Sequence, residues 1–333
     1  MNLDLVGLGS AIIDFVPAEI GVPLSEVRSF VPSSGGAVAN LLVAASRLGL
    51  KTSFLGCVGD DEFGAFILRD FGREGVDISS VKRISGIATG ISFYSVDEKG
   101  ERHYIFYRFP GYSEPEAMLR PEDIKAEYIA QTRVIHLSEA MLRRRHTRET
   151  AFKILQIAQE NNISVSYDPN VREALWSNKE DFLKTQRKAL SLANIYSSTL
   201  KEAISISGER TAKAAIETIM TLGPSTVVIR EKSRYTAAAP NQNFKIPIFK
   251  VKAVDTSGAG DAFDAGLLTG LIEGWTLDKA VMLGSAVAAL KVMKIGTRTG
   301  LPRMEEALGF IEERTKEGLR SSHTPKRNQF LKT

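Results

Sequence analysis

Val254-Asp-Thr-Ser-Gly-Ala-Gly-Asp-Ala-Phe263 is the stretch of this chain that says most about its fold and its chemistry. Its two glycines let the backbone pass close to a ligand, and the small and apolar residues that follow predict a helix running through Leu271. Backbone amides at a helix N-terminus attract anions, so a phosphoryl group in transfer would be stabilised there. Asp261 either caps this helix or accepts the proton of an attacking hydroxyl, and spacing alone leaves both readings open.

A second glycine-rich stretch, Gly35-Gly36-Ala-Val-Ala-Asn40, lies near the start of the chain. Bare backbone at the two glycines would let a polyol approach closely, and Asn40 offers both a donor and an acceptor to sugar hydroxyls. Asn is a mediocre helix former, so its place one turn into a predicted helix suggests a side-chain role. Asp14 follows the first predicted strand and either accepts from two adjacent hydroxyls or caps a turn.

Short apolar runs alternate with longer amphipathic segments over most of the chain. The predicted strands are 3–7, 53–57, 134–137, 164–167, 195–198 and 226–229, and the predicted helices are 38–48, 63–71, 148–160, 211–221 and 278–293. Apolar strands joined by helices over short links are typical of a parallel sheet covered by helices on both faces. The pattern therefore predicts an α/β fold. A dinucleotide-binding turn after the first strand is disfavoured, because Ile12 stands where that turn needs a small residue.

Two segments interrupt this rhythm. Residues 10–34 contain three prolines and no long helical pattern, and residues 90–112 begin as two alternating strands around a Lys-Gly turn. Paired together, they predict a small β-sheet lid over the carboxyl ends of the parallel strands, where it would exclude water. We expect residues 1–317 to form the main domain with this lid, and 318–333 to be a basic, flexible tail.

Composition and charge narrow the class of protein. The apolar fraction is 43% and the charged fraction 25%, values typical of soluble globular proteins, and no apolar stretch approaches the length of a membrane span. The net charge of +4 equals that of the acid-free tail, so residues 1–317 are formally neutral, a poor footprint for nucleic acid. Cys57 is the single cysteine, which excludes an intramolecular disulfide. We expect a cytoplasmic protein without nucleic-acid or membrane partners.

The two glycine-rich motifs together resemble the signatures of the PfkB, or ribokinase-like, family of carbohydrate kinases, from about residue 3 to about residue 313. The resemblance implies a ribokinase-like three-layer sandwich with a β lid, and an enzyme that transfers the γ-phosphoryl group of ATP, with Mg²⁺, to a sugar hydroxyl. It implies that Asp261 is the catalytic base. The implied anion hole is Gly258, Ala259 and Gly260, and the implied sugar contacts are Asp14, Gly35, Gly36 and Asn40.

The sequence departs from the family pattern on the nucleotide side. Thr199 replaces the Asn of an Asn-x-x-Glu element, while Glu202 is kept and is expected to hold Mg²⁺ through water. Arg230-Glu-Lys232-Ser233 replaces a Gly-x-x-Gly turn, and we expect its cations to contact phosphates instead. The predicted nucleotide contacts are Thr199, Arg230, Lys232, Ser233, Gly258 and Gly260. The resemblance also implies a K⁺ site at carbonyls near Asp255 and Thr256 and in the loop 296–300.

The acceptor sugar is predicted from three elements. Asp168-Pro-Asn-Val-Arg172 resembles fructokinases and 2-keto-3-deoxygluconate kinases, in which Arg172 would lie near the phosphate or an acidic substrate. Tyr94, Tyr107 and Arg108 either face the substrate, with Arg108 pairing a carboxylate, or lie on an exposed hairpin. Fructose ranks first and 2-keto-3-deoxygluconate second; a nucleoside kinase and a non-catalytic sensor remain alternatives. Lids of this family often pair between subunits, so a homodimer is expected.

Overall fold

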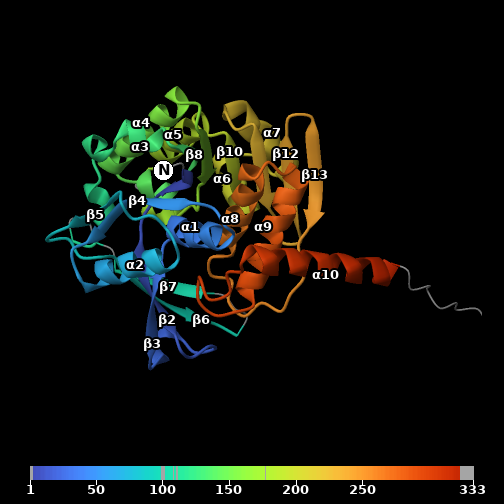
Figure 1. Cartoon of the computed structure of the whole chain (residues 1–333), viewed down its shortest axis with the longest axis horizontal. Coiled ribbons are helices and arrows are strands. Elements are labelled where there is room, and N and C mark those ends of the chain that lie inside the picture. Colours follow the sequence, from blue (N-terminus) through green and yellow to red (C-terminus); the bar gives the residue numbers. More distant parts are fainter. Residues whose placement is uncertain (1–2, 99–101, 108, 110–111, 177, 323–333) are drawn as a thin grey trace, which may run out of the picture.

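A nine-stranded sheet organises the computed structural model, which describes residues 3–98, 102–107, 109, 112–176 and 178–322 (Figure 1). The strand order is β13-β12-β11-β10-β9-β8-β1-β4-β5. The strands are β1 (Leu3–Leu8), β4 (Thr52–Gly59), β5 (Val81–Ile84), β8 (Thr132–Ser138), β9 (Ser164–Asp168), β10 (Ile195–Thr199), β11 (Thr226–Arg230), β12 (Arg234–Ala239) and β13 (Gln242–Pro247). Neighbours from β5 to β11 pair in parallel, and β12 and β13 add an antiparallel hairpin at one edge.

Helices cover both faces of this sheet. One face carries α3 (Ala126–Ile129), α4 (Arg145–Glu160), α5 (Lys179–Leu190), α6 (Leu200–Ser207) and α7 (Ala212–Leu222). The other carries α1 (Ala37–Arg47), α2 (Glu62–Arg73), α8 (Ala259–Ile272), α9 (Leu277–Val292) and α10 (Met304–Ser322). Short 3₁₀ turns lie at Leu24–Glu26, Pro115–Met118, Pro121–Asp123, Glu139–Met141 and Glu173–Leu175. The predicted α/β fold with three layers is confirmed, and the ends of each predicted strand and helix lie within three residues of those of an observed one.

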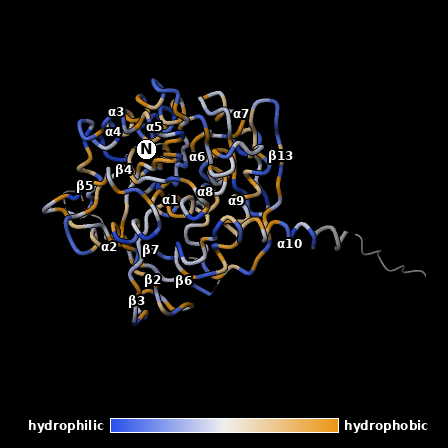
Figure 2. Tube along the Cα trace, in the orientation of Figure 1, coloured by the Kyte–Doolittle hydropathy of each residue, from blue (hydrophilic) through white to orange (hydrophobic). Residues whose placement is uncertain are grey.

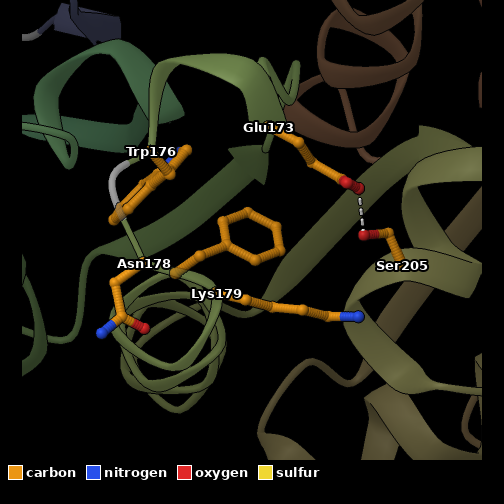
Figure 3. A pocket seen from close by; sticks show the side chains of 6 residues that line it. Glu173, Trp176, Asn178, Lys179 and Ser205 are labelled. Atoms are coloured by element: carbon orange, nitrogen blue, oxygen red, sulfur yellow. Dashed lines mark hydrogen bonds between the residues drawn. The ribbon is translucent and has the colours of Figure 1, made fainter.

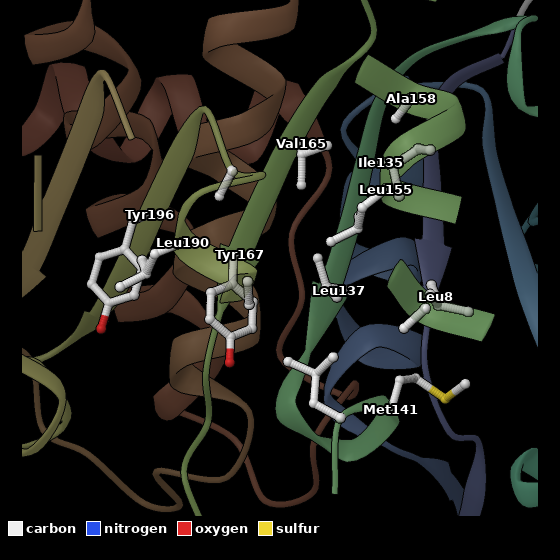
Figure 4. Packing of buried hydrophobic residues seen from close by; sticks show 14 of the residues in the cluster. Leu8, Ile135, Leu137, Met141, Leu155, Ala158, Val165, Tyr167, Leu190 and Tyr196 are labelled. Carbon is white, nitrogen blue, oxygen red and sulfur yellow. The ribbon is translucent and has the colours of Figure 1, made fainter. Parts of the chain in front are cut away.

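The core lies between the sheet and each helical layer. Leu8, Ile135, Leu137, Val165 and Tyr167 of neighbouring strands are buried in one cluster with residues of α4 and α5 (Figure 4). Figure 2 shows that hydrophobic stretches gather in the interior, whereas hydrophilic ones prevail at the periphery. Burial of both strand faces explains why these strands are apolar throughout, and it fixes their carboxyl ends along one edge of the sheet.

A separate four-stranded sheet stands beside the main body, at the bottom of Figure 1. Its order is β3-β2-β6-β7, formed by β2 (Ile12–Pro17), β3 (Phe30–Gly35), β6 (Ile91–Val96) and β7 (Arg102–Tyr107). The predicted small sheet from two distant segments is therefore confirmed. Phe15 links it to α2, since its ring stacks on Phe93 at 4.6 Å between centroids and meets Phe63 edge-on at 5.8 Å.

The C-terminal region differs from the expectation. Helix α10 continues to Ser322, five residues into the segment 318–333 that was predicted to be a tail, and residues 323–333 lie outside the described residues. None of the described helices is long and apolar enough to cross a membrane.

Candidate active site

Several predicted site residues lie at or after the carboxyl ends of the parallel strands. The strand order places β1 between β4 and β8, so the connections leave in opposite directions there, as at the ligand-binding crevices of open α/β sheets. Asp14 and Asn40 follow β1, Asp168 ends β9, and Arg230 ends β11. Helix α8 enters the same region with Asp261 in its first turn.

Asp261 is held at the N-terminal end of α8. Gly258 precedes the helix with φ of 69°, a left-handed conformation that glycine adopts without strain, and α8 begins at Ala259. The Asp261 Oδ2 atom accepts a hydrogen bond from Asn40 Nδ2 at 2.9 Å, between residues 221 positions apart. Burial raises the pKa of Asp261 to about 6, although the Asn40 hydrogen bond opposes this rise. A carboxylate with this pKa is a competent proton acceptor near neutral pH.

Asn40 connects Asp261 to the loop that follows α9. Its Oδ1 atom accepts from Arg298 Nε at 3.0 Å, so its amide points Nδ2 at Asp261. Arg298 also donates to Asp70 at 2.5 Å and is buried. Arg47, in the last turn of α1, donates to the Arg298 carbonyl at 3.0 Å and therefore fastens this loop to α1.

Asp14 lies against the start of α1. Its Oδ1 atom accepts from Ser92 Oγ at 2.5 Å, and its carboxylate packs against Gly35, where a Cβ atom would overlap it. Gly36 has φ of 105°, and a Cβ there would overlap the Ser10 carbonyl oxygen. The predicted sugar contacts Asp14, Gly35 and Gly36 are therefore brought together, one turn from Asn40.

Asp255 orders the segment that leads into α8. Its buried carboxylate accepts from the backbone amides of Ser257 and Gly296, each at 2.8 Å. Burial opposes ionisation, but the Lys291 charge and these hydrogen bonds outweigh it, so the pKa of Asp255 falls below its usual value. Its carbonyl oxygen accepts from Lys291 Nζ at 2.8 Å. The predicted K⁺ ligand is thus already bonded to an ammonium group of the chain.

Arg230 lies under the predicted anion hole, but it is committed to protein carboxylates. Its guanidinium pairs with Asp168 at 2.9 Å and with Asp264 at 2.9 Å, and it donates to Ser197 Oγ at 2.7 Å. Only 12% of its side chain is exposed. A Cβ on Gly260 would lie 3.4 Å from Arg230 Nη2, so the guanidinium supports the backbone of the first turn of α8. The guanidinium that was expected to contact phosphates therefore belongs to a buried ion-pair cluster.

The two carboxylates of this cluster titrate differently. Burial opposes ionisation of Asp168, but the Arg230 charge lowers its pKa below the usual value. Burial and the nearby Asp168 charge raise the pKa of Asp264 well above its usual range. Behind the cluster, burial lowers the pKa of His136 to about 4, so this imidazole is neutral at neutral pH and bonds Ser166 at 3.0 Å.

Thr199 and Glu202 form a capping box at the start of α6. Glu202 Oε2 accepts from the Thr199 amide at 2.8 Å and from its hydroxyl at 2.6 Å, and Oε1 accepts from the Val171 amide at 2.8 Å. Glu202 therefore joins the end of β10 to the loop after β9. Lys232 and Ser233 lie exposed in the β11–β12 turn.

Two of the residues predicted to contact the acceptor, Tyr94 and Tyr107, lie on opposite faces of the small sheet. Tyr94 is fully buried against Tyr104, with ring centroids 4.9 Å apart. Tyr107 is 45% exposed. It lies three positions along β7 from Tyr104, the ladder partner of Tyr94, and therefore on the opposite face, so Tyr94 and Tyr107 do not line one pocket. Arg108 lies outside the described residues. Arg172 is exposed, and its backbone amide donates to buried Glu139 at 2.8 Å.

Several residues of the site were not predicted. Asp264, Lys291, Arg298 and Tyr104 carried no expected role, and Asp168 was quoted only as part of a motif. Lys291 had a local signal, because it is the one charge in the otherwise apolar run Ala286–Val292 of a helix. The ion-pair partners of Arg230 had none, since they are 62 and 34 residues away from it in the sequence.

A pocket of about 140 Å³ lies on the α5–α6 side, apart from the residues around Asp261 (Figure 3). It is lined by Glu173, Trp176, Asn178, Lys179, Phe182 and Ser205. Glu173 and Ser205 are hydrogen-bonded across it. Its lining begins one residue after Arg172, so it borders the β9 loop rather than Asp261.

The fold and the site are those expected of a ribokinase-like phosphotransferase: a mostly parallel α/β sheet, a helix that starts after a left-handed glycine, and a carboxylate of raised pKa in its first turn. Residues 2–304 match the family model of the pfkB family carbohydrate kinases. The chain belongs to that family and is a sugar kinase, which transfers a phosphoryl group to a hydroxyl.

Similar proteins of known name point to two kinds of acceptor. The chain is 33% identical over 321 residues to probable fructokinase-2 of Arabidopsis thaliana, covering 92% of this chain and 95% of that protein. It is 31% identical over 321 residues to 5-dehydro-2-deoxygluconokinase of Clostridium botulinum (strain Eklund 17B / Type B), covering 94% of each. The crystal structure of fructokinase with bound ATP from Xylella fastidiosa matches with a TM-score of 0.84 and 26% identity, over 95% of this chain and 100% of that one.

Proposed function

We propose that this protein transfers the γ-phosphoryl group of ATP to a hydroxyl of a six-carbon keto sugar, with fructose as the first acceptor. Asp261 accepts the proton of the attacking sugar hydroxyl. The oxygen of that hydroxyl bonds to the γ-phosphorus while the bond between the γ-phosphorus and ADP breaks, and ADP leaves. The amides of Gly258, Ala259 and Gly260, at the N-terminus of α8, receive the charge on the transferring group. Asp14 and Asn40 hold neighbouring sugar hydroxyls and aim one of them at Asp261.

The observation that carries this proposal is the Asn40–Asp261 hydrogen bond of 2.9 Å. It joins the sugar-binding motif on α1 to the anion-binding motif on α8, so a hydroxyl held by Asn40 lies within reach of the base. Because Asn40 donates to Asp261, it favours the ionised carboxylate, the form that accepts a proton.

The nucleotide side fits Mg²⁺ bound mainly through phosphates and water. When bound, Mg²⁺ neutralises charge on the β- and γ-phosphoryl oxygens. Glu202 Oε1 accepts one hydrogen bond from Val171 and retains a second acceptor position, which suits a metal-bound water. Lys232, exposed in the turn after β11, and the Thr199 hydroxyl are the remaining groups that we assign to the nucleotide.

A keto-deoxy sugar acid is the second candidate acceptor, and Arg102 favours it. Arg102 lies on β7, donates to the Tyr104 hydroxyl at 3.2 Å, and is near enough to Asp261 that its charge opposes the burial-driven rise of that pKa. A cation on the small sheet facing the site suits a substrate carboxylate. This assignment gives Arg102 the role that the sequence suggested for Arg108.

A direct test is a substrate panel with ATP and Mg²⁺, in which ADP release and product mass are measured for fructose, 2-keto-3-deoxygluconate and 5-dehydro-2-deoxygluconate. We expect fructose to give the highest kcat/KM. Arg102→Met should lower kcat/KM for an acid acceptor by about tenfold or more, and for fructose by far less. Turnover of nucleosides alone would contradict the proposal, as would sugar binding without ADP release.

Two properties beyond the reaction follow from the surface and the composition. We infer a homodimer through the small sheet, because Ile105, Phe106 and Tyr107 on its edge strand β7 are each more than 40% exposed. We infer a cytoplasmic location, because Cys57, the single cysteine, is a free and buried thiol.

A further inference from the structure

Lys291 is a buried cation beside the anion hole that the proposed mechanism does not use. It lies in the last turn of α9, its side chain is fully buried, and Nζ donates to the Asp255 carbonyl oxygen at 2.8 Å. A buried ammonium is costly unless it is paired and hydrogen-bonded. The groups around the Lys291 ammonium must therefore stabilise its positive charge.

The groups around the ammonium carry full or partial negative charges. The Asp255 carboxylate is buried with it and attracts it, and the carbonyls at the C-terminal end of α9 carry the negative end of the helix dipole. The loop 296–300 packs against the backbone of Lys291, because a Cβ on Gly300 would lie 2.5 Å from the Lys291 carbonyl oxygen. Lys291 is thus fixed between this loop, through its backbone, and the Asp255 segment, through Nζ.

Lys291 acts on the anion hole through Asp255. The Asp255 carboxylate fixes the amides of Ser257 and Gly296, and Ser257 immediately precedes the left-handed Gly258 that starts α8. Without a neighbouring positive charge, ionised Asp255 would be buried alone, and its two amide contacts would weaken. The positions of the Gly258 and Gly260 amides depend on this segment.

A K⁺ ion does not fit the predicted site in the presence of this side chain. The Asp255 carbonyl, one of the expected ligands, is taken by Nζ, and a second cation at that carbonyl would be repelled by the ammonium at close range in a buried environment. We propose that Lys291 is a built-in replacement for a monovalent cation, that it positions the anion-hole segment, and that phosphoryl transfer by this protein is independent of K⁺.

The test compares wild-type protein with Lys291→Met, which removes the charge and keeps an unbranched apolar side chain. Lys294→Met, three residues on at an exposed position, is the matched control. For each protein, kcat and KM are measured in K⁺-free buffer with tetramethylammonium as counterion and during a K⁺ titration. Thermal unfolding is followed over the same titration without sugar, so a wrong acceptor assignment does not affect this readout.

We expect wild-type kcat and melting temperature to be unchanged by K⁺ relative to tetramethylammonium, and Lys294→Met to behave alike. In Lys291→Met, kcat should fall about tenfold or more because the anion hole shifts, with a smaller change in KM for the sugar. K⁺ should then restore part of the activity and raise the melting temperature saturably, since it binds only the folded variant.

Two results would overturn the proposal. One is a saturable activation of wild-type protein by K⁺, which needs no variant to be stable. The other is a folded Lys291→Met whose activity and melting temperature stay insensitive to K⁺ and to NH₄⁺. If Lys291→Met alone does not fold, Lys291→Met with Asp255→Asn should fold and remain K⁺-insensitive; failure of this charge-free pair to recover stability would also contradict the assigned pairing.

Discussion

Asp261 and its immediate partners decide the chemistry at the scale of single residues. In the structure, Asp261, Asn40, Asp14 and Gly36 lie near the starts of α8 and α1. The sequence could group them because each belongs to a short motif with local backbone demands. It did not predict that Asn40 donates directly to Asp261, nor that Arg298 sets the amide orientation, because these contacts join positions more than 200 residues apart. Burial of the carboxylate, and hence its raised pKa, likewise depends on the assembled fold.

The raised pKa of Asp261 predicts a pH dependence. The base is active only when ionised, so kcat/KM for the sugar should rise tenfold per pH unit below about pH 6 and level off above it. Asn40→Ala should move this limb to higher pH, because the lost hydrogen bond stabilised the charged form. The profile is measured with ATP saturating at each pH; an unchanged limb in Asn40→Ala, or a limb near pH 4 in the wild type, would refute the assignment.

At the scale of elements, apolar strands were predictable and amphipathic edges were not. Strands β1, β4 and β8 to β11 are buried on both faces and read directly as apolar runs. Strands β5 and β13 were missed, because their exposed positions carry polar residues and dilute the pattern. Strand β12 is mostly buried, but it ends in three alanines, a residue type depleted in strands. The cations of residues 230–233 were predicted to contact phosphates. The Arg230 side chain instead points inward from the end of β11 and pairs with carboxylates of β9 and α8.

Arg230 should therefore contribute more to the free energy of unfolding than to the binding of the nucleotide. Arg230→Met leaves Asp168 and Asp264 buried without a counter-charge, which should cost about 3–5 kcal/mol of unfolding free energy in urea. Arg234→Met, at an exposed position four residues on, should unfold near the wild-type midpoint. A loss below about 1 kcal/mol for Arg230→Met, together with a large rise in KM for ATP, would restore the phosphate-contact interpretation.

At the scale of the whole molecule, the main sheet and the small sheet together enclose the site. The two segments that form the small sheet could be recognised because they break the α/β rhythm, yet the direction of each side chain could not. Tyr94 turns inward to Tyr104, whereas Tyr107 turns to the opposite face. Helix α10 continues past residue 317, at which the main domain was predicted to end, and the extent of that domain stays a prediction.

The exposed edge strand β7 predicts association in solution. Ile105→Lys places a charge on this edge and should convert a dimer into a monomer in size-exclusion chromatography with light scattering. Ile20→Lys changes an exposed isoleucine outside the strands and should leave the mass unchanged. A monomeric wild type at micromolar concentration would rule out the inferred interface.

The central claim is that Asp261 is the base of a sugar kinase, and the kcat of Asp261→Asn tests it most directly. Asn keeps the shape and cannot take up the proton, so kcat with the best sugar should fall by about 10²–10⁴-fold. Stability should not fall at pH 8, because burial disfavours the ionised carboxylate that the substitution removes. Glu273→Gln, an exposed carboxylate at the other end of α8, should retain full activity. A folded Asp261→Asn protein with wild-type kcat would contradict the account.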